Sequence, residues 1–248
     1  MTDTAPADLG LPPSNTTTAR RRDIGLAAAA VLLAVAYFLA PPLLFPGNSN
    51  DFPRAFVAYW SSGGGRDFPP DLQHLVDHQF RYHLVRVVIA LLLLAVLVTL
   101  AVRLRRFRLP VGALALAAAV LLIANVQGAV SPFGTLLPTL ASGPAAPDLA
   151  TALAQVRDQV QNGPVSPALD VMLDEYVRWH VWKGALAGLV AAVLIALSVV
   201  TWRQRRRWVS VLIAVLALAA LVVVLANVIT VANPHPGFLL LLEGGAIG

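Results

Sequence analysis

The stretch that decides the fold is residues 81–126, which read RYHLVRVVIALLLLAVLVTLAVRLRRFRLPVGALALAAAVLLIANV. It holds one apolar run over 82–102 and the start of another over 109–130, and a short segment with four arginines separates them. A helix that crosses the bilayer core, about 30 Å thick, needs about 20 apolar residues at about 1.5 Å per residue. Both runs meet this length. The stretch therefore predicts a transmembrane helical hairpin with an arginine-rich turn.

The rest of the chain has the same character. Of its 248 residues 58% are hydrophobic and only 12% are charged, whereas soluble domains carry roughly 25% charged residues. Further long apolar runs cover 24–45, 181–202 and 208–231. The chain contains no cysteine, which excludes a disulfide-stapled domain and any thiolate metal site. These features predict an all-α integral membrane protein with five transmembrane helices.

The second half of the chain repeats the first hairpin. Residues 81–86 and 178–183 share the order arginine, aromatic, histidine, two apolar residues and a cation, at an offset of 97. The return spans both contain Ala-Asn-Val, at Asn125 and Asn227, at an offset of 102. The pattern predicts that spans 2–3 and 4–5 are a duplicated parallel hairpin. Such hairpins are expected to form a four-helix bundle, with span 1 packed beside it.

Positive charge in the short loops predicts the orientation. Residues 1–23, 103–108 and 203–207 together hold eleven arginines and three aspartates, while the remaining segments hold seven basic and ten acidic residues. We therefore expect a cytoplasmic N-terminus and an extracytoplasmic C-terminus in a plasma or inner membrane. Because 17 of the 18 basic residues are arginine, we expect a GC-rich, bacterial source. The clusters abut membrane spans, so we expect no nucleic-acid partner.

The predicted segments follow from these spans. We expect a disordered tail at 1–23, the first span at 24–45, an extracytoplasmic loop and helix at 46–81, hairpin one at 82–132, an extracytoplasmic loop with amphipathic helices at 133–180, hairpin two at 181–234 and a C-terminal tail at 235–248. The serines and glycines at 61–65 indicate that loop 46–70 is flexible, and Asp71 is expected to cap a helix start. No small-residue cleavage site follows the first run, so we expect that span to stay uncleaved.

The repeated polar residues are the candidate ligand-binding site. They are His83, Arg86, Asn125, His180, Lys183 and Asn227. Each cation follows its histidine by three residues and so shares its helix face, and the helix N-termini there carry positive potential. We expect this outward-facing cluster to bind an anionic group, from a membrane lipid or a partner membrane protein. The alternative is that the cations snorkel to the interface while the amides bond neighbouring helices.

Cofactor chemistry gives weaker alternatives. His83 and His180 could ligate a b-type haem across a bundle, although they are expected at the membrane edge. Asp71, His74 and His78 share one helix face and could hold a metal ion. We predict no cofactor as the main hypothesis. No nucleophilic triad or phosphate-binding loop is present, so we expect a non-enzymatic protein. A transport component is a further alternative, disfavoured because the spans contain no acidic residue.

Overall fold

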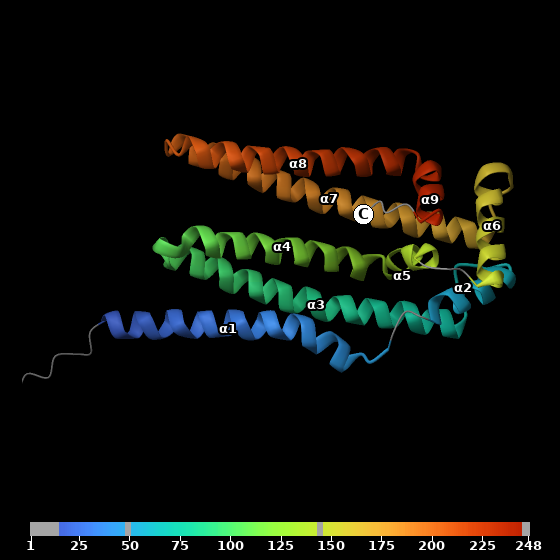
Figure 1. The fold of residues 1–248 in the computed structure, drawn as a ribbon, viewed down its shortest axis with the longest axis horizontal. Coiled ribbons are helices and arrows are strands. Elements are labelled where there is room, and N and C mark those ends of the chain that lie inside the picture. The colour runs from blue at the N-terminus through green and yellow to red at the C-terminus, as the bar shows by residue number, and fades with distance from the viewer. Residues whose placement is uncertain (1–14, 48–50, 143–145, 245–248) are drawn as a thin grey trace, which may run out of the picture. The chain divides into compact units, whose positions relative to one another are not determined.

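The computed structural model describes residues 15–47, 51–142 and 146–244, and every regular element in these ranges is helical (Figure 1). Five helices are long and apolar enough to cross a membrane, which confirms the predicted number of spans. They are α1 (Asn15–Leu44), α3 (Pro70–Arg103), α4 (Arg108–Val130), α7 (Pro167–Arg203) and α8 (Arg207–Ala232).

Shorter helices connect these spans. They are α2 (Phe52–Ser61), the 3-10 turn η2 (Arg105–Phe107), α5 (Pro132–Leu136), the 3-10 helix η3 (Leu137–Ala141), α6 (Pro147–Asn162) and α9 (Pro234–Leu242). In most of them a proline lies in the first turn, where its fixed φ suits a helix and its missing N–H costs nothing. Helices α3 and α4 are joined near η2, and α7 and α8 are joined at residues 204–206; we call these ends of the four helices the turn ends. Their opposite ends adjoin the region that is defined below as the cap, and we call them the cap ends.

Helices α3 and α7 are longer than a membrane requires. With 37 residues, α7 is about 56 Å long at about 1.5 Å per residue, against a hydrocarbon core of about 30 Å. Its N-cap residue is Ser166, whose Oγ accepts a hydrogen bond from the Leu169 N–H at 3.3 Å. The expected cap at Asp71 is not formed, because α3 begins at Pro70 and places Asp71 inside the first turn.

The chain divides into two compact units, and the first contains residues 15–39 and 88–120 of the described part. Its core is formed by Leu93 and Leu97 of α3 and by Ala115 and Ala118 of α4, and the apolar side of α1 packs against it. Asp23 of α1 also accepts a hydrogen bond at 2.6 Å from Arg103 Nε. Span 1 therefore lies against the first hairpin in this unit.

The second unit contains the largest buried core of the described residues. We call this region the cap: α2, α5, η3, α6, α9, and the first turns of α3 and α7. Its centre is aromatic, and Phe52, Phe56, Tyr59, Phe133 and Phe238 are at most 1% exposed. The ring of Phe133 lies 5.9 Å from that of Phe52. Burial of large apolar rings stabilises such a domain without disulfides.

Two parts of the cap differ from the sequence prediction. The expected flexible loop contains α2, whose aromatic residues at 52, 56, 59 and 60 follow helical spacing. The expected C-terminal tail contains α9, whose Phe238 and Leu242 are buried. At the other terminus α1 already begins at Asn15, within the expected tail, and residues 1–14 lie outside the described ranges.

Helix α8 packs side by side with α7, whose first turns continue beyond α8 into the cap (Figure 1). Gly184 allows the close approach, because a Cβ there would lie only 3.3 Å from Asn227 Cβ, whereas a Cβ on Gly188 would make ordinary van der Waals contact with Val224 at 3.8 Å. Nearer the turn end, the hydroxyls of Ser198 and Ser210 lie 3.0 Å apart. This hairpin is thus held by small residues along one seam.

Candidate functional site

The first predicted pair, His83 and Asn125, joins α3 to α4 near the cap end. Asn125 Oδ1 lies 2.9 Å from His83 Nδ1, and Asn125 Nδ2 donates to the Leu121 carbonyl at 2.7 Å. The second contact fixes the amide so that its oxygen faces the imidazole. Nδ1 must therefore carry the proton, and Nε2 is left as an acceptor.

The second predicted pair repeats this arrangement between α7 and α8. Asn227 Oδ1 lies 2.7 Å from His180 Nδ1, and Asn227 Nδ2 donates to the Val223 carbonyl at 2.7 Å. Both side chains are buried, with His180 3% and Asn227 5% exposed. The same reasoning assigns the proton to Nδ1 of His180. In both hairpins the asparagine thus joins the return helix to the histidine helix.

The two hairpins differ at the other imidazole nitrogen. Gln79, one turn before His83, lies with its Nε2 3.1 Å from His83 Nε2 and donates to it. The corresponding position before His180 is Tyr176, whose ring lies edge-on at 4.5 Å between centroids. His180 Nε2 is consequently buried with no hydrogen-bond partner among the described residues. A buried unpaired acceptor is rare and indicates either strain or an absent ligand or water.

Two glycines make room for these rings. A Cβ on Gly128 would lie 2.7 Å from three ring atoms of His83, so no larger residue fits there without moving the imidazole. A Cβ on Gly237 of α9 would lie 2.6 Å from the Tyr176 hydroxyl. Neither glycine was predicted from the sequence, because a close approach between helices leaves no local pattern.

The two predicted cations lie on aromatic rings of their own helices. Arg86 Cζ is 4.5 Å from the centre of the Tyr82 ring, and Arg86 Nη2 donates to the Tyr82 hydroxyl at 2.7 Å. Lys183 Nζ is 4.9 Å from the centre of the Trp179 ring. Both cations are half-buried, and no carboxylate of the described residues lies within ion-pair distance of Lys183. Cation–π contact thus replaces the salt bridge expected for a half-buried lysine.

The six predicted residues therefore form two kinds of pair. The structure joins each histidine to its asparagine and each cation to a ring four residues earlier on its own helix. Gln79 and Tyr176 belong to the same site and were not predicted. Their position, one turn before each histidine, is the signal that could have identified them.

The weak metal candidates are not brought together. Among the residues that the structure describes, no group of three histidine, aspartate or glutamate side chains could hold a metal ion. His78 instead points to the Phe45 carbonyl, 3.2 Å from its Nε2. Asp71 and His74 line a surface pocket of about 510 Å³ with Asp51 and Arg54 of α2. Asp71, His74 and His78 share one helix face but do not form a metal site, because His78 contacts Phe45 while Asp71 and His74 face a pocket beside α2.

Comparison of the chain with models of protein families, with curated proteins and with solved structures gave no match. The function must therefore be argued from the site itself.

Proposed function

We propose that this multi-pass membrane protein binds the phosphate group of an anionic lipid at the outer boundary of the membrane, through Lys183 and, in the other hairpin, Arg86. The proposal includes a plasma-membrane location with the N-terminus in the cytoplasm, because the arginine-rich segments then face inward. It also treats the two hairpins as copies, so that each supplies one cation at the same depth.

Lys183 carries the proposal. A half-buried ammonium without a carboxylate partner retains most of its capacity to attract an anion, since an aromatic face stabilises it by only about 1–2 kcal/mol. Its neighbour Trp179 is of the type that lies at headgroup level in membrane proteins. A lipid phosphate at that level would meet the ammonium directly.

The histidine–asparagine pairs have a separate role in this proposal. Asn227 accepts the Nδ1–H of His180, and Nε2 of that ring carries no proton, so the imidazole offers no N–H to an anion. What the pair does is join α7 to α8 one turn from Lys183, which fixes the depth and direction of the cation. His83 and Asn125 do the same for Arg86.

A short-chain phosphatidylglycerol tests the proposal because it carries the headgroup but little acyl chain. We expect it to raise the melting temperature of the detergent-solubilised protein, while the matching phosphatidylcholine does not. Lys183→Gln should lose at least half of the shift, and Lys183→Arg should retain it. Arg178→Gln is the matched control, because Arg178 lies nearby but pairs with Glu175 at 2.6 Å. An undiminished shift in Lys183→Gln would reject the lipid site in favour of a purely structural lysine.

His180 favours a second candidate function, axial ligation of haem iron. Its Nδ1–H is held by Asn227, which orients an imidazole for ligation through Nε2, and no residue in the described part of the chain is hydrogen-bonded to that Nε2. His83 lacks this freedom, because Gln79 occupies its Nε2. The test is a Soret band after haem is added to the purified protein. Tyr176→Gln should abolish the band by supplying His180 with the donor that Gln79 gives His83, and the absence of any band in the wild type would end this candidate.

A further inference from the structure

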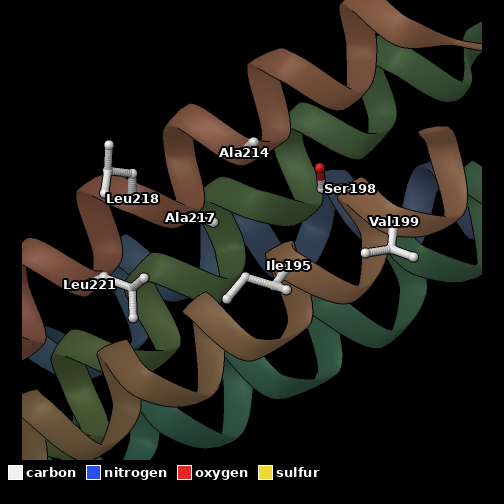
Figure 2. Close-up of a pocket in the computed structure, with 7 residues that line it drawn as sticks. All are labelled: Ile195, Ser198, Val199, Ala214, Ala217, Leu218 and Leu221. Atoms are coloured by element: carbon white, nitrogen blue, oxygen red, sulfur yellow. The ribbon is translucent and has the colours of Figure 1, made fainter.

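A groove runs along the α7–α8 hairpin on its turn-end half. It consists of two adjoining pockets of about 280 and 270 Å³, which share Ser198, Val199 and Ala214. Figure 2 shows the pocket nearer mid-helix, between Ile195 and Val199 of α7 and the α8 residues that face them. This groove is separate from the histidine and lysine residues of the proposed site.

The surface of the groove is apolar. Small side chains at Ala214 and Ala217 create the hollow, and the larger chains of Ile195 and Leu221 form its sides. The two serine hydroxyls in its floor are already satisfied: Ser210 Oγ donates to the Ser198 carbonyl at 2.7 Å, and Ser198 Oγ lies 3.0 Å from the Ser210 carbonyl. The groove therefore offers contact to a hydrocarbon chain and no free polar group to a polar ligand.

The length of the groove matches one leaflet. Ile195 and Arg203, at its two ends on α7, are eight residues apart and so about 12 Å apart along the helix. Half of a hydrocarbon core of about 30 Å is about 15 Å. The groove is therefore about as long as the depth that one acyl chain of a phospholipid occupies in a single leaflet.

One end of the groove is positively charged. Arg203 and Trp202 line the pocket at the turn end, and Arg205, Arg206 and Arg207 follow within four residues. None of these four arginines forms an ion pair with a described carboxylate. Trp202 lies 5.8 Å from the guanidinium of Arg207, which keeps the aromatic ring and the charge together at the rim. The rim is therefore complementary to an anionic headgroup.

We propose that the α7–α8 groove binds an anionic phospholipid, with one acyl chain between Ile195 and Ala214 and the phosphate at Arg203. The apolar surface and the length of the groove match an acyl chain, and the serines in its floor are already hydrogen-bonded to each other. The arginines at its rim match the anionic headgroup. The phosphate site at Arg203 lies 20 residues, or about 30 Å, along α7 from Lys183 and does not depend on the proposed function.

Native mass spectrometry of the full chain tests the proposal, with equal amounts of long-chain phosphatidylglycerol and phosphatidylcholine in the detergent. We expect the protein to retain phosphatidylglycerol preferentially. Arg203→Gln should weaken that retention about fivefold, since an arginine near a membrane surface contributes about a factor of five to anion binding. Ala214→Leu should abolish retention in the groove by filling it, so that the number of bound phosphatidylglycerol molecules falls by one while the separate site at Lys183 keeps its own.

Two matched variants control for charge and volume. Arg108→Gln removes an exposed arginine from the other hairpin, and Ala219→Leu enlarges an exposed alanine of α8 that does not line the groove. Both should retain the lipid as the wild type does. Equal retention of the two phospholipids, or full retention by Ala214→Leu, would overturn the proposal. A dimer that Ala214→Leu dissociates would also overturn it, by assigning the groove to a second copy. Short-chain lipid binding at Lys183 is unaffected by either result.

Discussion

Replacement of Asn227 by leucine is the most informative perturbation of the hairpin. It removes the acceptor of the His180 Nδ1–H while keeping a similar volume against Gly184. His180 is 3% exposed and its Nε2 has no partner among the described residues, so the imidazole would lose the one hydrogen bond that those residues give it. An unsatisfied buried donor costs about 1–3 kcal/mol, although pairwise hydrogen-bond energies measured within membranes average about 0.6 and reach about 1.7 kcal/mol. We expect Asn227→Leu to lower the free energy of unfolding by about 2 kcal/mol.

The first hairpin supplies the control. Asn125→Leu removes the same contact, but His83 is partly exposed and keeps its bond to Gln79. We expect a cost of about 1 kcal/mol or less, because water can reach the ring. The double variant His180→Leu with Asn227→Leu removes both partners and should recover most of the loss, since an apolar pair leaves no buried group unpaired.

Unfolding in mixed micelles with increasing dodecyl sulfate measures these differences. The reasoning is refuted if Asn227→Leu costs no more than Asn125→Leu, or if His180→Leu and Asn227→Leu are additive in the double variant. Additivity would mean that the 2.7 Å contact contributes no coupling energy.

Three other perturbations have defined outcomes. Gly128→Ala should destabilise the protein by about 1–3 kcal/mol by displacing the His83 ring, whereas Gly188→Ala should be neutral or stabilising by up to about 1 kcal/mol, and thermal unfolding of the two variants compares them. Phe133→Ala should cost about 3–5 kcal/mol in the cap and make it sensitive to limited proteolysis while helical circular dichroism of the spans persists. Burial raises the pKa of Tyr59 above its ordinary value of 10.0, so the neutral phenol is favoured on folding; its contribution to stability should be constant below pH 10 and fall as the pH rises further, and Tyr59→Phe should make the alkaline fall in melting temperature smaller.

The spans were predictable because hydropathy and length are properties of single segments. The run 208–231 needs no partner to be recognised as a membrane helix, and α8 occupies almost the same residues. The cap was harder to predict from the sequence, because α2 and α9 are stabilised by contacts with segments that are distant along the chain. From the local sequence alone, the prolines at 234 and 236 indicate a helix break, yet Pro234 begins α9, whose Phe238 is buried in the cap.

The candidate site shows the same division. Equal depth for His180 and Asn227 followed from the repeat, and the structure joins them. The sequence did not reveal that Lys183 would lie on Trp179, because cation and ring positions depend on rotamers and not on spacing alone. The sequence shows that Gln79 and Tyr176 differ at equivalent positions. Only the structure shows the consequence, which is that His180 Nε2 is buried without the donor that Gln79 gives His83.

The uninterrupted course of α7 has a mechanical consequence. Its only proline is at the first position, and a helix without an internal proline bends gently, so its two ends cannot tilt independently. Leu169 and Met172 are embedded in the aromatic cap, while Arg203 lies about 50 Å away at the far terminus. A tilt of the cap would therefore be transmitted along α7 and would displace the guanidinium group of Arg203 at its far end.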